Sequence, residues 1–289
     1  MAYGDLTRKA AFAQPDWLRE VPERVGERRL PQGRVVFTGC GTSFHAAQTG
    51  GDALQALEAV LSPPRADLLV AVSHEGGTAL TLEAARAFDG PVWLVTGKAE
   101  GPIADVADDV LVVTPEVEES YCHTVSYTCA VAALAVLGGE DVSRLPDLVE
   151  AVLGERLPAS EHERCLIVGA GREWPTAQEA ALKLREGAHV AAEAHHTEQL
   201  LHGHLAAIDE RVRAFVLEGE GRAAERAADA VRALGEIGAE TTLVPTVHPV
   251  VDIVRFQLLT LALSERRGVN PDLIRLDDPR WKAARDAYA

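Results

Sequence analysis

Short apolar runs alternate with helical patterns along most of this chain. Runs rich in Val, Leu and Ile predict buried strands, and alanine-rich segments with helical spacing of hydrophobic residues predict helices. The first predicted strand begins at residue 35, and the others cover 67–73, 91–96, 109–114, 165–169, 212–218 and 241–245. The predicted helices cover 45–60, 78–88, 123–138, 176–192, 221–237 and 250–267. Such alternation builds parallel sheets with helices on both faces, so the fold is predicted to be α/β.

One motif occurs twice. Residues 35–54 read VVFTGCGTSFHAAQTGGDAL, and residues 165–184 read CLIVGAGREWPTAQEAALKL. Each stretch is an apolar run, a Gly-x-Gly turn and an alanine-rich helical pattern, and the glycines repeat at an offset of 130 residues. Because that offset is about the length of one α/β domain, the sequence predicts two copies of one fold.

Prolines and charges divide the chain further. A helical pattern interrupted by Pro15 and Pro22 opens it, and a charged stretch with two more prolines separates the two repeats. The predicted parts are an N-terminal helical segment at 1–30, a first domain at 31–140, a helical linker at 141–162, a second domain at 163–267 and a tail at 268–289. Within the tail we expect a loop and then a short helix at 279–288.

The composition excludes several classes of protein. With 28 Lys+Arg against 44 Asp+Glu, the formal net charge is −16, which argues against a nucleic-acid partner. No apolar run is long enough to span a membrane and no secretory leader pattern is present, so we expect a cytoplasmic protein without a membrane partner. The four cysteines show no C-x-x-C spacing, which predicts reduced thiols rather than a disulfide framework or a zinc site.

The two Gly-x-Gly turns do not fit a dinucleotide cofactor. That fingerprint needs a third glycine, where helix and strand approach closely. The third position is Phe44 in the first copy and Trp174 in the second. We therefore predict no dinucleotide.

Two hydroxyl-rich turns in the first copy are instead candidates for binding an anion. The turn after the first strand contains Cys40, Gly41, Thr42 and Ser43, and the turn after the second reads Ser73-His74-Glu75-Gly76-Gly77-Thr78. Free N–H groups and the helix dipole favour an anion at such turns. Helix capping alone would explain one of them. Two at the carboxyl ends of neighbouring parallel strands predict a ligand crevice.

Longer stretches carry a family resemblance. They are AQP at 13–15, GCGTSFHAA at 39–47, SHEGGT at 73–78, EAALKLREGAHVAAEAHHTEQLLHGHLAAID at 179–209 and FQLLTLALSERRGVNPD at 256–272. With them the chain resembles the tandem sugar isomerase (SIS) domain proteins, in particular the isomerase half of glucosamine-6-phosphate synthase (glutamine:fructose-6-phosphate amidotransferase). The family's glutaminase domain has no counterpart in these residues, so glutamine hydrolysis by that route is not expected.

The resemblance implies a fold and a class of ligand. It implies two tandem SIS domains, each a five-stranded parallel sheet flanked by helices in three α/β/α layers. It also implies a homodimer with sites near the interface, a phosphorylated sugar or amino sugar as small-molecule partner, and no cofactor. The expected activity is that of an aldose–ketose isomerase or deaminase. The alternative is a non-catalytic sugar-phosphate sensor, since SIS domains also serve as regulatory modules.

Three residues are the candidates for catalysis. Glu186 follows Lys183 and Glu179 at helical spacing, so all three project from one helix face. Taken alone, this pattern is typical of a surface Glu–Lys pair. The resemblance implies that Glu186 shuttles the proton between neighbouring sugar carbons while Lys183 assists. It also places His202 where the family's ring-opening histidine lies, and histidine titrates near neutral pH.

The neighbourhood of His202 also raises the question of a metal. Glu193 and Glu198 lie among five histidines, at 189, 195, 196, 202 and 204. No H-E-x-x-H spacing is present, however, and the family needs no metal. We predict none.

Two departures from the family pattern bear on the substrate. Glu75 replaces the second serine of the phosphate-binding turn, and His123 stands where a serine that contacts phosphate is expected. Because a carboxylate repels a phosphate, we expect the distal group of the sugar to be bound differently. That group is a differently placed phosphate, a carboxylate, or the hydroxyl of an unphosphorylated amino sugar.

The tail departs from the family as well. Asp277-Asp278-Pro279-Arg280 matches the family motif, but the position of the Schiff-base lysine is Ala284. Lys282 lies two residues earlier. Isomerisation or deamination is therefore favoured over amine loading.

Overall fold

The structure is a computed structural model that describes residues 3–160, 162 and 164–288. Residues 1–2, 161, 163 and 289, at or near the edges of the predicted parts, lie outside the described residues. Internal contacts divide the chain into two units. We call Phe12–Glu118 with Val125–Ala151 the N-terminal unit, and Met1–Ala11, Glu119–Thr124 and Val152–Ala289 the C-terminal unit.

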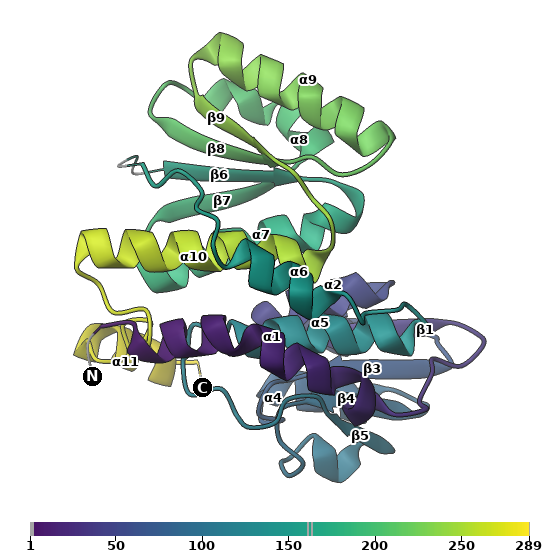
Figure 1. Cartoon of the computed structure of the whole chain (residues 1–289). Coiled ribbons are helices and arrows are strands. Elements are labelled where there is room, and N and C mark those ends of the chain that lie inside the picture. The colour runs from purple at the N-terminus through teal and green to yellow at the C-terminus, as the bar shows by residue number, and fades with distance from the viewer. Residues whose placement is uncertain (1–2, 161, 163, 289) are drawn as a thin grey trace. The chain divides into compact units, whose positions relative to one another are not determined.

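The N-terminal unit contains a parallel sheet of five strands in the order β2-β1-β3-β4-β5. The strands are β1 (Val35–Gly39), β2 (Ala53–Gln55), β3 (Leu68–Val72), β4 (Val92–Thr96) and β5 (Asp109–Val112). Helices α2 (Thr42–Gly50) and α5 (Val125–Leu137) pack together on one face, and α3 (Ala56–Leu61) and α4 (Ala79–Ala87) on the other (Figure 1). Val36, Leu69 and Leu94 face α4 in one apolar cluster. The predicted α/β fold is confirmed in this unit.

Strand β2 corrects the helix predicted over 45–60. Helix α2 ends at Gly50, and Gly51 has a φ of 140°, which favours glycine. Gly50 lies against the ring of Phe37, where a Cβ would be 2.6 Å from a ring carbon. The prediction was wrong because the helical spacing of hydrophobic residues continues past both glycines. Pairing of β2 with β1 outweighs that local pattern.

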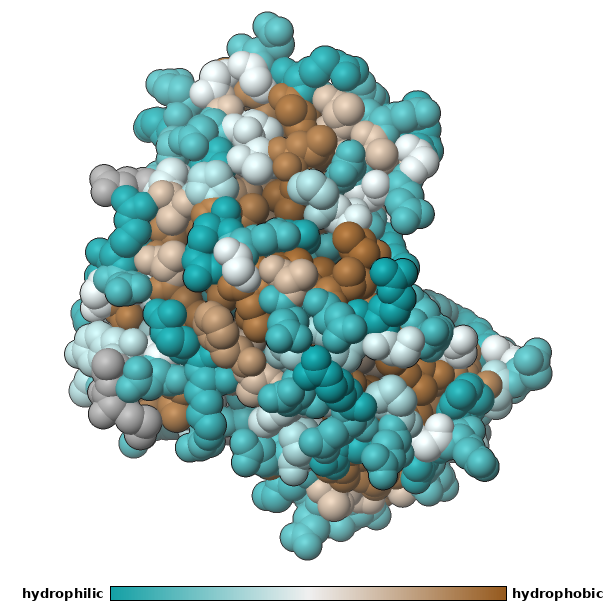
Figure 2. Space-filling model, in the orientation of Figure 1, coloured by the Kyte–Doolittle hydropathy of each residue, from teal (hydrophilic) through white to brown (hydrophobic). Residues whose placement is uncertain are grey.

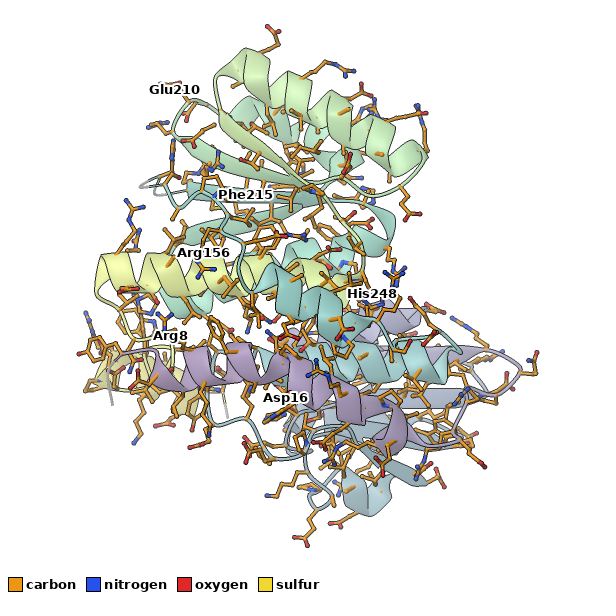
Figure 3. The ribbon with its side chains drawn as sticks, in the orientation of Figure 1. Arg8, Asp16, Arg156, Glu210, Phe215 and His248 are labelled. Atoms are coloured by element: carbon orange, nitrogen blue, oxygen red, sulfur yellow. The ribbon has the colours of Figure 1, made fainter. Side chains whose placement is uncertain are left out.

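The C-terminal unit contains a second parallel sheet, in the order β7-β6-β8-β9. Its strands are β6 (Arg164–Gly169), β7 (Ala191–His196), β8 (Val212–Leu217) and β9 (Glu240–Val244). Helices α7 (Trp174–Ala188) and α10 (Pro249–Arg267) cover one face, and α8 (Thr197–Leu201) and α9 (Arg222–Ile237) cover the other. Phe215 points from β8 toward α10 (Figure 3) and meets Phe256 edge-on at 5.7 Å. The outer side of α9 is mostly hydrophilic, as Figure 2 shows at the top.

Two expectations for this second sheet were wrong. Its described residues form four strands, not the five that the resemblance implies. Strand β9 ends at Val244 and α10 begins at Pro249, which leaves no room for a counterpart of β5. Strand β7 was not predicted. The predicted helix at 176–192 instead ends at Ala188, because His189 adopts a left-handed conformation with φ 54°.

Helix α1 (Asp5–Val25) continues through both of its prolines, so the predicted interruption was wrong. Proline removes one backbone hydrogen bond per position. Fully buried Leu18, Val21 and Val25 hold the later turns in place by packing. The predicted linker contains α6 (Leu145–Val152), and the tail contains α11 (Pro279–Asp286). Among the described residues, no helix is both long enough and apolar enough to cross a membrane.

A buried charge network ties α10 to the segment after α6. Asp252, 2% exposed, accepts hydrogen bonds from the N–H of Val247 at 3.0 and 3.2 Å and lies 3.1 Å from Arg255. Arg255 also donates to Glu155 at 2.7 Å. Burial raises the pKa of Asp252 to about 7, although the Val247 N–H and Arg255 act in the opposite direction.

The raised pKa of Asp252 predicts a pH-dependent stability. The folded state holds this proton more tightly than the unfolded chain, so the stabilisation is complete below the ordinary pKa of 3.8 and is lost as the pH rises toward 7. Asp252→Asn removes the titration. Urea unfolding from pH 4 to 8 should show a steeper fall in the wild type than in the variant, by up to about 1.4 kcal/mol per pH unit. Parallel curves would contradict this prediction.

Candidate functional site

A buried ion cluster on α7 joins the two predicted residues Lys183 and Glu186. Lys183 donates to Glu186 Oε2 at 2.7 Å and lies 3.4 Å from Glu179 Oε1. The Lys183 and Glu179 side chains are fully buried, whereas the Glu186 side chain is 25% exposed. The alternative of an exposed surface pair is therefore wrong. Glu179 was on the predicted face but was not a predicted site residue; its burial has no signal in the sequence.

The charges on α7 decide which group can accept a proton. Burial disfavours a charged ammonium, but Glu179 and Glu186 outweigh it and raise the pKa of Lys183 well above its usual value. Lys183 is thus a fixed cation rather than a base. It engages one oxygen of Glu186, and the partial exposure of Glu186 leaves its carboxylate accessible from outside the protein. Of the three groups, Glu186 alone combines a carboxylate with access.

Close packing fixes this cluster in place. Gly187 follows Glu186, and a Cβ on Gly187 would lie 2.4 Å from Thr260 Cγ2 of α10 and 3.1 Å from Cys122 Sγ. Only glycine allows α10 to approach α7 this closely. The turn of α7 that carries Glu186 is consequently packed closely against α10.

His202 lies elsewhere on the C-terminal unit. It follows α8, its side chain is 75% exposed, and its Nε2 lies 3.2 Å from Glu198 Oε2. Glu198 is also bonded by Arg226, which lowers the pKa of that carboxyl. Among the described residues the partner of His202 is therefore Glu198, and the structure does not bring His202 into hydrogen-bond contact with Lys183 or Glu186.

The other histidines of this region interact in pairs. The rings of His195 and His204 are 4.4 Å apart, and His196 meets Trp174 at 5.9 Å. His195 also lies 3.2 Å from Glu193. Within the described part of the chain, no three His, Cys, Asp or Glu side chains gather as ligands for a metal ion.

The first hydroxyl-rich turn joins β1 to α2 in the N-terminal unit. Gly41 has a φ of 55°, and the N–H groups of Phe44 and His45 donate to its carbonyl. A Cβ on Gly39 would lie 2.9 Å from the backbone of Ser43, so the turn requires glycine there. Thr42 and Ser43 form the first turn of α2, whose N-cap is Gly41.

The second turn joins β3 to α4 and lies beside the first. Buried Ser73 places its Oγ 3.3 Å from Thr78 Oγ1, while Glu75 is exposed. Thr78 precedes α4 but makes no side-chain capping bond. Thr81 on α4 donates to Cys40 Sγ at 3.8 Å, which links the two turns. The structure thus places the two predicted turns of this unit side by side.

The two remaining predicted histidines are placed differently. The carbonyl of His74 accepts from the N–H of Gly97 at 2.8 Å and from Thr96 Oγ1 at 3.0 Å, and its ring lies against Gly97. His123 belongs to the C-terminal unit, in the segment Glu119–Thr124. In the tail, Lys282 and Ala284 are both exposed on α11, where Asp278 caps the helix by accepting from the N–H of Arg280 at 2.9 Å.

Comparisons with known proteins identify a domain in the C-terminal half of the chain. The family model of the SIS domain matches residues 159–270. The chain carries a SIS domain. A curated relative, the glutamine--fructose-6-phosphate aminotransferase [isomerizing] of Pyrococcus horikoshii, is 28% identical over 336 aligned positions, covering 93% of this chain and 56% of its own length. This SIS-domain chain spans about half the length of the curated relatives that it matches.

Two solved structures share the fold. The glucosamine-6-phosphate deaminase of Thermotoga maritima superposes with a TM-score of 0.76 at 21% identity, covering 93% of this chain and 97% of its own. The tagatose-6-phosphate ketose/aldose isomerase of Escherichia coli superposes with a TM-score of 0.76 at 18% identity, covering 94% and 95%. The chain therefore shares its fold with these two proteins over nearly its whole length.

Proposed function

We propose that this chain is an aldose–ketose isomerase or deaminase of a sugar phosphate or amino sugar, with Glu186 as its proton shuttle. The observation that carries the proposal is a partly exposed carboxylate held at 2.7 Å by a buried, charged lysine. A non-catalytic sensor needs no such group. The names of the relatives support the same chemistry, since an isomerising aminotransferase, a deaminase and a ketose/aldose isomerase all act at the first two carbons of a sugar.

In the proposed reaction, Glu186 takes a proton from one of these carbons and returns it to the neighbouring one. The carbonyl double bond moves in the opposite direction through an enediol, or an enolamine for an amino sugar. The ammonium of Lys183 favours negative charge that develops on the substrate oxygen. His202 takes the proton of the anomeric hydroxyl and donates it to the ring oxygen, which opens the sugar ring. No metal or cofactor is required in this scheme.

We further propose that both units are SIS domains in tandem, over 31–140 and 163–267. The strand order β2-β1-β3-β4 of the first sheet recurs as β7-β6-β8-β9 in the second, and the Gly-x-Gly turns recur with it. We also propose a cytoplasmic homodimer. The 75% exposure of His202 supports a role for this residue in a site that a second copy completes.

The two hydroxyl-rich turns are proposed to bind the distal group of the sugar. Cys40, Gly41, Thr42 and Ser43 offer N–H and hydroxyl donors, as do Ser73 and Thr78, and His74 follows Ser73 in the second turn. His123 stays a proposed substrate-binding residue. Glu75 offers only a negative charge. This makes Glu75 the residue that selects against an ordinary 6-phosphate.

Glu75→Ser tests that role. The change removes a repulsive carboxylate and restores a donor, so the Kd for fructose 6-phosphate and glucose 6-phosphate should fall by about tenfold. Isothermal titration calorimetry measures it. The control is Glu83→Ser, which makes the same replacement on α4 and should leave Kd unchanged. An unchanged or weaker affinity in Glu75→Ser would refute the assignment.

The proposed activity itself is tested by deuterium uptake from heavy water at the first and second sugar carbons, followed by NMR. The panel contains phosphorylated and unphosphorylated ketoses and amino sugars, and binding of each is measured in parallel. Uptake supports the enzyme and names the substrate class. Binding without any uptake across the panel would instead establish the sugar-phosphate sensor.

A further inference from the structure

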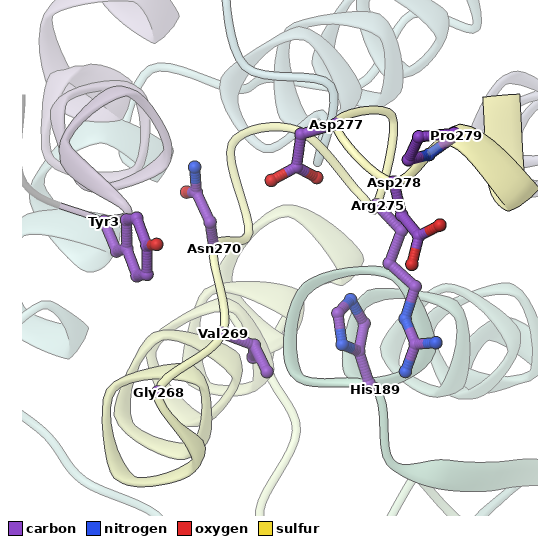
Figure 4. Close-up of a pocket in the computed structure, with 9 residues that line it drawn as sticks. All are labelled: Tyr3, His189, Gly268, Val269, Asn270, Arg275, Asp277, Asp278 and Pro279. Atoms are coloured by element: carbon purple, nitrogen blue, oxygen red, sulfur yellow. The ribbon is translucent and has the colours of Figure 1, made fainter.

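A cavity of about 520 Å³ lies within the C-terminal unit, at the ends of three elements (Figure 4). His189 comes from the end of α7, Asn270 follows α10, and Arg275 and Asp277 precede α11. Cavities of this size hold small molecules. None of the residues that we assign to proton transfer or substrate binding lines this cavity, so those roles do not explain its polar lining.

Arg275 presents a cation to this cavity and acts electrostatically on the neighbouring Asp278. Its guanidinium lies over the ring of Trp281, 4.2 Å from the centroid, and beside His189 in Figure 4. Among the described residues it has no hydrogen-bond or ion-pair partner. Stacking leaves the N–H edge of a guanidinium open, and that edge matches a carboxylate or phosphate. An anionic group of a ligand therefore fits here.

Asp277 and Asn270 present complementary groups. Asp277 likewise has no hydrogen-bond or ion-pair partner within the described chain. Asp278 differs, since it pairs with Arg280 at 2.8 Å and caps α11. The side-chain oxygen of Asn270 accepts from the N–H groups of Gly4 and Asp272, which leaves its amide nitrogen as a donor. The cavity thus offers one cation, one amide donor and two carboxylates, of which Asp278 is already paired with Arg280.

The backbone around the cavity is held in an uncommon conformation. His189, Ile274 and Arg275 are the non-glycine residues with positive φ in the described chain, at 54°, 42° and 64°. This conformation is rare for a β-branched residue such as Ile274. Strain of this kind collects at functional sites, where the surrounding structure maintains it. Here it occurs at the lining residues His189 and Arg275 and at Ile274, which precedes Arg275.

We propose that this cavity binds a small zwitterion, with its carboxylate or phosphate on Arg275 and its ammonium on Asp277. A simple dianion would meet the uncompensated carboxylate of Asp277, and a simple amine would meet the guanidinium of Arg275. A ligand that carries both charges can pair with both groups. α-Amino acids and amino-sugar phosphates share this chemistry. Its lining does not include Lys183 or Glu186, although His189 follows Glu186 by three residues, and binding here does not depend on the proposed isomerase activity.

Calorimetric titrations of the full chain test the proposal with four probes. Glucosamine 6-phosphate and L-glutamate carry both charges, glucose 6-phosphate lacks the ammonium, and glucosamine lacks the anion. We expect at least one zwitterion to bind, and the pair identifies which source the site accepts. Arg275→Gln and Asp277→Asn should each weaken that binding by about tenfold or more. The controls on the neighbouring helix, Arg285→Gln and Asp286→Asn, should leave it unchanged.

A local signal separates this cavity from the proposed substrate site. The pKa of His189 is lowered by burial and by Arg275 and Arg267, with Asp277 acting in the opposite direction. A zwitterion bound to Arg275 and Asp277 lies beside His189, so the imidazole resonances of His189 should shift as the ligand is added in NMR titrations. The proposal is overturned if neither zwitterion binds, if both cavity variants bind like the wild type, or if binding leaves the His189 resonances unchanged.

Discussion

Glu186→Gln is expected to abolish deuterium uptake into the sugar while leaving the fold intact. Glutamine has nearly the same shape as glutamate, and its amide oxygen can still accept the hydrogen bond from Lys183 that Glu186 accepts at 2.7 Å. An amide cannot take a proton from carbon, however. General-base catalysis contributes roughly 10²–10⁴-fold, and the exchange rate should fall by about that factor. The same NMR experiment measures it.

Two further variants make this result specific. Glu186→Asp keeps the carboxylate but withdraws it by one methylene, so an intermediate rate is expected. Glu225→Gln removes an exposed partner of Arg222 on α9 and should leave exchange at the wild-type rate. If Glu186→Gln retained full exchange while still binding the sugar, another base would have to act, and the assignment of Glu186 would be wrong.

The sequence identified this cluster but not its environment. Helical spacing alone places Glu179, Lys183 and Glu186 on one face, and the structure confirms that arrangement. Spacing could not reveal that Lys183 is fully buried, because lysines are rarely buried and the burial depends on α10 packing against Gly187. The distinction between a surface pair and a functional cluster is therefore a tertiary property.

The fold likewise contains elements that the sequence predicts and elements that depend on tertiary contacts. Apolar runs such as 67–73 and 165–169 are strong strand signals, and both strands are present. Strands β2 and β7 were missed because each follows an alanine-rich helix and pairs at a sheet edge, where local pattern is weak. The cavity residues His189, Arg275 and Asp277 lie in turns without periodicity. Their proximity arises only when the ends of α7 and α10 meet the tail.

Lys183→Met is expected to have the largest effect on stability. The substitution keeps an apolar stem of similar length but removes the ammonium that faces buried Glu179 and Glu186. Removing one partner of a buried ion pair costs about 3–5 kcal/mol, because a charge remains in a medium that solvates it poorly. Urea unfolding measures the loss. Lys9→Met is the matched control: Lys9 and Glu119 are 65% and 64% exposed, so that pair should contribute less than about 1 kcal/mol.

The loss in Lys183→Met should also depend on pH, in a direction that identifies its cause. Without the ammonium, the buried carboxylate of Glu179 is easier to hold protonated, so its folded pKa rises above its unfolded value. Stability is then greatest at low pH and falls as the pH rises through that folded pKa. The variant should lose more stability at pH 8 than at pH 5, and adding Glu179→Gln should remove most of that difference. A loss equal at both pH values would mean that packing, not charge, holds the cluster together.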